Sequence, residues 1–169
     1  MKQVFSLLLV VSLTSFSCNQ TKNVSEVSNE DYKESASDES DIIPNDSLVI
    51  SFEQTGCFGT CPIHKMYIYQ DGSATYTGVR HTKLTGEFSG NFSSKEIDAI
   101  LSKADELSFY DSKREYTSAI TDLPTTKIYI HNGNNKHQVT AYADYPESIQ
   151  LMIAYLFEVS QNKDWQIVE

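Results

Sequence analysis

The sequence has little positive charge. It contains 13 lysine and arginine residues against 23 aspartate and glutamate residues, so its formal net charge is −10 at pH 7. Nucleic-acid binding requires Lys and Arg to neutralise phosphates, and basic clusters also draw proteins to anionic lipid. We therefore expect no nucleic-acid partner and no electrostatic docking on a lipid surface. The acidic balance is typical of a soluble domain.

The sequence also lacks the short motifs that mark common enzyme classes. There is no Gly-x-Ser-x-Gly elbow, and the seven glycines are scattered rather than gathered in a phosphate-binding loop. No two of the four histidines have the i, i+4 spacing of a zinc-protease helix. We therefore predict no catalytic residue, no metal ligand and no cofactor. The histidines are His64, His81, His131 and His137, and the last two are expected across a hairpin as solvated strand residues.

Three acidic residues follow the first expected helix closely enough to form an acid pair. Asp111, Glu115 and Asp122 lie in one predicted loop, with Arg114 between them. Paired carboxylates serve general acid–base catalysis, but solvation of the loop and capping explain the same residues. A hydrolase whose site is assembled by tertiary contacts is therefore a third functional hypothesis.

No apolar run is long enough for a transmembrane helix, which needs about 20 residues. The apolar segment Val4 to Leu13 has ten residues, follows Lys2 and ends shortly before Cys18. This pattern predicts a secretory signal peptide over residues 1–17, with Cys18 as the lipidated first residue of a mature bacterial lipoprotein. Ser15 stands where such a cleavage motif usually has Leu, so cleavage without lipidation is the alternative.

Residues 18–47 are predicted to be the lipidated Cys18 followed by a flexible acidic tether. Residues 19–47 hold two lysines against eight acidic residues, a charge of −6. Such a segment buries too little apolar area to offset its ordering entropy, and a coil of this length spans about 30 Å. Lipid at Cys18 would make the bilayer a partner. Asn19 to Lys22 lack an acidic cluster resembling a surface-export signal, so we expect an exported protein, lipid-anchored in the outer membrane and facing the periplasm.

A single globular domain is expected over residues 48–169. Alternating apolar and polar residues predict strands; one of them places His64, Met66 and Ile68 on one face. Asp71-Gly72 is a strong hairpin turn. The predicted strands are Leu48 to Phe52, Ile63 to Gln70, residues 73–80, Leu84 to Phe92, Lys127 to His131 and Lys136 to Tyr142, with a short terminal strand within Trp165 to Val168.

Two amphipathic helices complete the domain. Ser93 and Glu96 form a capping box, and apolar residues recur behind them at helical spacing as far as Leu107. Pro146 is expected as the first residue of the second helix. The order ββββαββα predicts an α+β fold, a mainly antiparallel sheet of about six strands with both helices packed on one face. The other face would be solvated and carry Tyr67 and Tyr69.

The sequence has three cysteines, and lipidation of Cys18 would leave Cys57 and Cys61 as a pair. In an exported protein such a pair can persist as a disulfide, and Gly59 permits the turn between them. One interpretation is a structural disulfide that fixes the entry to the second strand and contributes about 2 kcal/mol. The alternative is thiol redox or copper chemistry, because Cys-x-x-x-Cys-Pro resembles the copper-binding motif of Sco-type thioredoxin-fold proteins. No helix is predicted directly after the motif, unlike in that family.

Tyrosine is abundant, with ten residues. Six of them could make an aromatic recognition surface, as tyrosine often does at interfaces. Ordinary strand propensity is the other explanation. These tyrosines are Tyr67, Tyr69, Tyr76, Tyr116, Tyr142 and Tyr145.

The segment Cys57-Phe58-Gly59-Thr60-Cys61-Pro62, followed by Met66 to Gly72, resembles the start of an uncharacterised bacterial family, domain of unknown function 6438. Later residues that are similar to this family include Tyr116, Asp122-Leu123-Pro124, Val139, Tyr142 and Pro146. The resemblance covers roughly residues 48–160 and implies a lipoprotein or secreted protein of Bacteroidetes-like bacteria. It implies no activity. His64 departs from the pattern, since the family often has Tyr there.

These observations predict a membrane-anchored envelope lipoprotein with a non-catalytic binding or structural domain. Its partners would be the lipid bilayer, through the Cys18 anchor, and an envelope protein. An inhibitor of an envelope enzyme is one concrete form of this hypothesis. The alternative is a thiol redox or copper-binding protein that uses Cys57 and Cys61.

Overall fold

A computed structural model describes residues 47–168 of the chain. The predicted signal peptide, the lipidation site at Cys18 and nearly all of the predicted acidic tether lie outside the described residues. Within residues 47–168, no helix is both long and apolar enough to cross a membrane.

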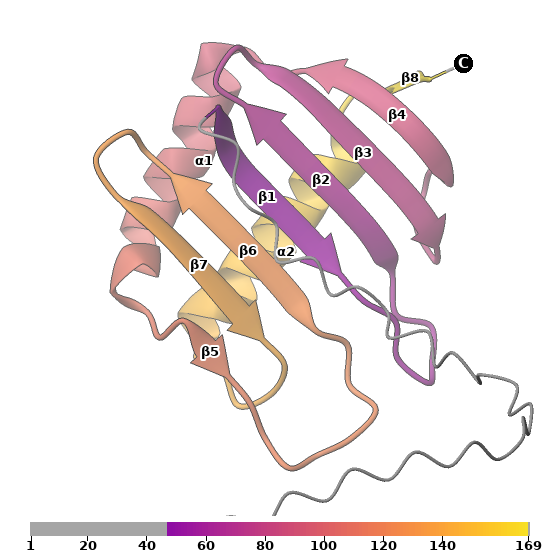
Figure 1. The fold of residues 1–169 in the computed structure, drawn as a ribbon, viewed down its shortest axis with the longest axis vertical. Helices are drawn as coiled ribbons and strands as arrows, with labels where there is room; N and C mark the ends of the chain where they lie inside the picture. Colours follow the sequence, from indigo (N-terminus) through magenta and orange to yellow (C-terminus); the bar gives the residue numbers. More distant parts are fainter. Residues whose placement is uncertain (1–46, 169) are drawn as a thin grey trace, which may run out of the picture. The chain divides into compact units, whose positions relative to one another are not determined.

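The described residues form an eight-stranded sheet with two α-helices (Figure 1). The strand order is β5-β7-β6-β1-β2-β3-β4-β8, and all neighbours are antiparallel except β5 and β7. The elements are β1 Leu48–Gln54, β2 Ile63–Tyr69, β3 Ser73–Arg80, β4 Gly86–Asn91, α1 Ser94–Glu106, the 3₁₀ turn η1 Phe109–Asp111, β5 Glu115–Tyr116, β6 Thr126–His131, β7 Lys136–Ala141, α2 Glu147–Asn162 and β8 Gln166–Ile167.

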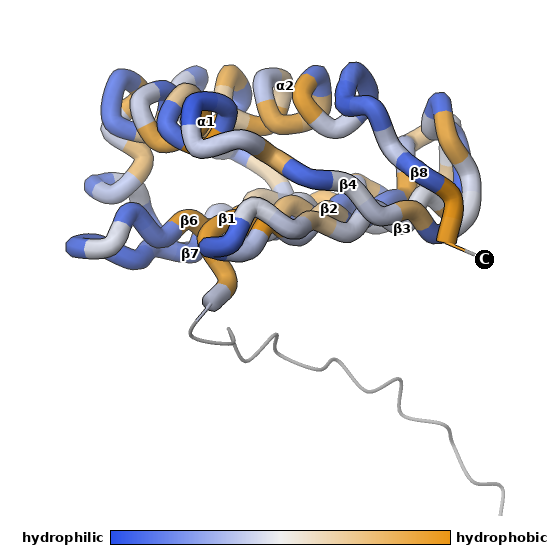
Figure 2. Tube along the Cα trace, turned by 90° about the horizontal axis from the view of Figure 1, so that it is seen from above, coloured by the Kyte–Doolittle hydropathy of each residue, from blue (hydrophilic) through white to orange (hydrophobic). Residues whose placement is uncertain are grey.

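Both helices cover the same face of the sheet (Figure 2). Side chains alternate along a strand, so every second residue faces the helices: Ile50 and Phe52 on β1, and Met66 and Ile68 on β2, are fully buried. Residues with the opposite parity, such as Tyr67, face away from the helices. The core therefore lies in the single layer between helices and sheet.

The ends of the helices follow the local sequence. Ser93 accepts a hydrogen bond from the Glu96 backbone N–H, and the Glu96 carboxylate accepts one from the Ser93 N–H at 2.8 Å, which confirms the capping box. Pro146 is the N-cap of α2 rather than its first helical residue. The one-residue difference is small, because proline's fixed φ suits either position beside the first turn.

The fold class is the predicted one, but the sheet has eight strands rather than about six. The additional strands are β8, foreseen as a short terminal strand, and the two-residue β5, which pairs parallel to β7 through Glu115 and Tyr116. A strand of two residues is too short to show the apolar–polar alternation that predicts a strand from sequence. β5 could therefore be recognised only from its pairing with β7. The fourth strand begins at Gly86 rather than at Leu84.

The expectation that His137 is a solvated strand residue is wrong. The β6–β7 register pairs His137 with Ile130, a fully buried residue, and this parity places His137 on the helix-covered face. Its ring packs edge-on against Phe109 at 5.5 Å. His131, one residue out of phase with Ile130, is half-buried.

Gly78 provides a test of how closely β3 packs against the chain that follows it. A Cβ atom at Gly78 would overlap the carbonyl oxygen of Leu84, a backbone atom that cannot rotate away. We expect Gly78→Ala to lower the free energy of unfolding by about 1–3 kcal/mol through overpacking. Urea unfolding would measure it.

Gly59→Ala is the matched control, because a Cβ there would meet only Cys57 Sγ at an ordinary 3.7 Å. Equal stability of the two variants would contradict the close approach of Leu84 to β3.

Candidate functional site

The loop between β1 and β2 is closed by a disulfide between Cys57 and Cys61, whose Cα atoms are 5.7 Å apart. Inside the loop, the Gly59 N–H donates to Cys57 Sγ at 3.2 Å. Phe58 projects from it and is 90% exposed. The predicted cysteine pair is thus a disulfide in the structure, and it holds a large apolar side chain in water.

A second loop lies next to the disulfide loop. The Thr55 N–H donates to the Thr125 carbonyl at 2.9 Å, and the Thr125 N–H donates to Thr55 Oγ1 at 2.9 Å. These bonds join residues 55–62 to residues 117–125, and we call the two segments together the loop end (Figure 1). The second segment exposes Ile120 (54%) and Leu123 (38%).

One of the six tyrosines supports this second segment: Tyr142 Oη accepts a hydrogen bond from the Leu123 N–H at 3.3 Å. Tyr116 Oη accepts a hydrogen bond from the Lys113 N–H at 3.0 Å, just before the segment. The six tyrosines do not form one recognition surface: Tyr76 is buried in the core and Tyr145 packs against it, whereas Tyr67 lies on the opposite face of the sheet. Of the two explanations offered by the sequence, a single aromatic surface made by all six tyrosines is therefore excluded, and ordinary strand propensity remains.

The face of the sheet away from the helices carries a polar cluster around Glu53. Tyr67 Oη donates to the Glu53 carboxylate at 2.7 Å, and Lys65 Nζ lies 3.9 Å from the same group. The Glu53 side chain is only 13% exposed. Burial, and then the hydrogen bond to Glu53, raise the pKa of Tyr67 above its ordinary value. Glu53 was not predicted as a site residue, although the alternation of the strands places it on the same face as Lys65, its partner in the β1–β2 register.

His64 lies under the loop end, on the helix-covered side, and is fully buried. Its Nε2 donates to Gln54 Oε1 at 2.9 Å, and Gln54 Nε2 donates to Thr126 Oγ1 at 3.3 Å. The polar chain therefore crosses three strands, β2, β1 and β6. Among residues 47–168, nothing forms a hydrogen bond with His64 Nδ1, which is buried. Burial lowers the pKa of His64 to about 4, so the ring is neutral at pH 7.

The other candidate residues are dispersed. Asp111, Glu115 and Asp122 are all exposed, on η1, on β5 and in the loop that follows. Among residues 47–168, no three histidine, cysteine, aspartate or glutamate side chains come together as a metal-binding group. His137 is held by Ser112 Oγ at 3.2 Å, and burial followed by the charge of Arg114 lowers its pKa.

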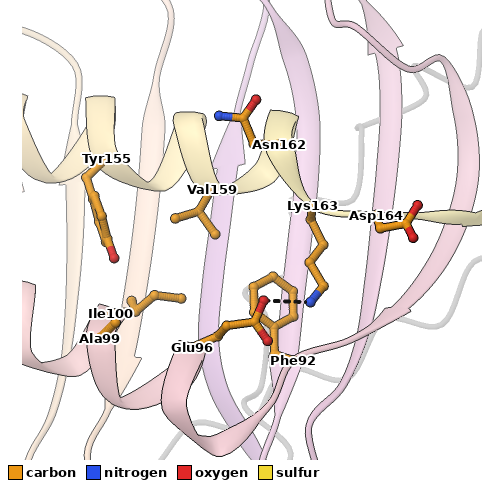
Figure 3. A pocket seen from close by; sticks show the side chains of 9 residues that line it. All are labelled: Phe92, Glu96, Ala99, Ile100, Tyr155, Val159, Asn162, Lys163 and Asp164. Carbon is orange, nitrogen blue, oxygen red and sulfur yellow. Dashed lines mark hydrogen bonds and ion pairs between the residues drawn. The ribbon is translucent and has the colours of Figure 1, made fainter.

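A cavity of about 360 Å³ lies between α1 and α2 (Figure 3). Glu96 and Lys163 meet across it in an ion pair of 2.8 Å, and Lys163 Nζ stands 4.4 Å from the centre of the Phe92 ring. The hydrogen bonds from Lys163 and Ser93 lower the pKa of Glu96 to about 2. These polar groups already satisfy one another and tie the two helices together.

A second cavity, of about 290 Å³, lies on the other side of α1, and Ser94, Asp98 and His131 are among its lining residues. In the described part of the chain, no hydrogen bond joins these three side chains. They therefore do not make the contacts by which a base activates a nucleophile.

The chain belongs to a protein family that is defined by a domain of unknown function. A family model described as "Domain of unknown function (DUF6438)" matches residues 48–160, which is most of the chain. This match confirms the family suggested by the Cys-Phe-Gly-Thr-Cys-Pro segment. Searches of the curated proteins and of the solved structures found no significant match.

The buried His64 predicts a specific loss of stability in acid. Its folded pKa of about 4 lies below its ordinary value of 6.5, so the unfolded chain binds a proton first as the pH falls. The contribution of neutral His64 to the free energy of unfolding is fully present above pH 6.5. It is lost as the pH falls from 6.5 to 4, and the loss amounts to about 3 kcal/mol. Denaturant unfolding at a series of pH values would measure the slope.

His64→Phe is the control, since it removes the titrating group from a site lined by Phe52, Tyr76 and Phe157. We expect a stability offset at all pH values and a much smaller slope, with a remainder from His137. An unchanged slope in this variant would refute the assignment to His64.

Proposed function

We propose that this protein is an exported lipoprotein, anchored through Cys18 in the outer membrane and facing the periplasm, whose folded domain binds another component of the envelope without catalysing a reaction. One observation carries the binding role: Phe58 is 90% exposed on a loop closed by the Cys57–Cys61 disulfide. Partners would be the bilayer, through the anchor, and a lipid or protein component that meets Phe58.

The disulfide supports this role because it restricts the loop before any partner arrives. A rigid loop loses less conformational entropy on binding than a flexible one. Aromatic side chains are also the usual anchors of interfaces. Because the Phe58 side chain is exposed, it contributes nothing to the hydrophobic core. It is therefore available to contact a partner.

Thiol redox chemistry is the second candidate, and the surroundings of Cys57 favour it. Its sulfur already accepts the Gly59 N–H at 3.2 Å, and the Arg80 guanidinium lies against the neighbouring Gly56. After reduction, the Gly59 backbone donor would stabilise the Cys57 thiolate. Copper binding at the reduced pair is the related form of this candidate.

Lipidation is tested by the intact mass of the protein extracted from membranes. We expect the mass of the chain from Cys18 onward plus the mass of attached acyl chains. Cys18→Ser should abolish both the added mass and the membrane association. An unmodified mature mass in the parent protein would contradict the anchor.

The role of the cysteine pair is tested by replacing both residues. We expect Cys57→Ser with Cys61→Ser to lower the free energy of unfolding by about 2 kcal/mol while the domain still folds. In the parent protein, a reduction potential below about −300 mV, unchanged by added copper, would mark a structural disulfide.

The opposite results would favour the redox candidate. They are an unaltered unfolding curve in the double variant, a potential near those of oxidoreductases, or tight Cu(I) binding by the reduced protein.

A further inference from the structure

The loop end differs in composition from the rest of the chain. Residues 55–62 and 117–125 contain one charged residue, Asp122, in a protein whose charged residues number 13 positive and 23 negative. The remaining residues are mostly threonine, glycine, serine and proline around Phe58, Ile120 and Leu123. Such a surface can leave water without stripping the solvent from many charges, which would be costly.

The apolar side chains stand on the tips of loops rather than in a hollow. Phe58, Ile120 and Leu123 are 90%, 54% and 38% exposed. They come from two segments that the paired Thr55 and Thr125 hydrogen bonds hold together. A projecting apolar tip of this kind needs no shaped pocket if its partner is a lipid layer, into which amphipathic surfaces sink by about 5–10 Å.

The chain enters the domain at the other end of the sheet. The Ser47 carbonyl accepts the Gln70 N–H at 2.7 Å, beside the turn that joins β2 to β3, whereas the disulfide loop joins the opposite ends of β1 and β2 (Figure 1). The seven residues of β1 separate the two ends. At about 3.4 Å per residue, this places Ser47 about 25 Å from the loop end.

We propose that the loop end rests on the lipid bilayer, with Phe58, Ile120 and Leu123 inserted at the boundary between head groups and acyl chains. This inference rests on the proposed function, because the anchor at Cys18 keeps the domain beside the membrane.

The length of chain between the anchor and the domain agrees with this orientation. The sequence predicts a tether over the 29 residues from Asn19 to Ser47, and a flexible coil of that many residues has an average span of about 30 Å. This is close to the height at which Ser47 would stand above the membrane. The effective concentration of a tethered group at its binding site is greatest when the average length of the linker matches the distance it bridges. The three apolar side chains of the loop end are then enough to hold the anchored domain on the bilayer, although they would hold an unanchored domain only weakly.

Tryptophan reporters on vesicles test the proposal. The chain from Cys18 onward would be coupled through its Cys18 thiol to a maleimide phospholipid, in vesicles of phosphatidylethanolamine and phosphatidylglycerol with or without brominated acyl chains. Coupling makes the result independent of natural lipidation, so failure of the natural anchor would be seen separately by mass. We expect Phe58→Trp and Ile120→Trp to lose about half of their added emission in brominated vesicles, as insertion requires.

Ile167→Trp is the matched control, because Ile167 is exposed (75%) but lies away from the loop end. It is on the edge strand β8, which β3 and β4 separate from β2, the strand that follows the disulfide loop. Its emission should be unchanged, as should that of the parent protein, whose single tryptophan, Trp165, is buried. Quenching in the Phe58→Trp and Ile120→Trp variants alone would support the proposal. Absence of quenching in both, the result if Phe58 instead fits a protein pocket, would overturn it, and so would equal quenching in the Ile167→Trp variant.

Discussion

The position of β1 in the middle of the sheet is the constraint on which the rest of the structure depends. β2, β3 and β4 follow it as a local meander, whereas β6 returns from far along the chain to pair with its other edge. Ile50 and Phe52 are fully buried between these neighbours and the helices. A shift of one residue in either register would move both side chains to the uncovered face. The hydrophobic core therefore specifies both pairings together.

The same two pairings create the loop end. Because β1 ends where β2 and β6 begin, the disulfide loop after β1 and the segment before β6 emerge side by side. The polar chain from His64 through Gln54 to Thr126 ties the three strands together beneath them. The strands thus supply a rigid base, and the disulfide restricts the one loop that carries Phe58. Stability and the proposed binding role meet at this end of the domain.

The helix-covered face uses its polar groups differently. Glu96 first completes the capping box of α1 and then pairs with Lys163 beyond the end of α2. Lys163 in turn lies over the Phe92 ring. One carboxylate thereby fixes a helix terminus and joins two elements that are 67 residues apart. The cavity between the helices is closed at this point by interactions internal to the domain.

Much of the fold could be predicted because its signals are local. The alternation in β2 places His64, Met66 and Ile68 on the buried face, Asp71-Gly72 forms the predicted hairpin, and Ser93 with Glu96 begins α1. The cysteine pair was also apparent as a candidate site. The features that could not be predicted from the sequence depend on pairing between distant segments. β5 is defined only by its contact with β7, and His137 is buried because of the β6–β7 register rather than any feature of its own segment.

By itself, the sequence determined the elements other than β5, the covered face and the spacing of the cysteines, because alternation, helical periodicity and turn residues act over a few neighbours along the chain. Only the tertiary structure decided which strand lies beside β1, and therefore that residues 117–125 lie beside the disulfide loop, joined to it through Thr55 and Thr125. The pairing of β1 with β6 joins segments more than 70 residues apart. It is specified by the burial of a shared core, a property of the whole domain that no local pattern contains.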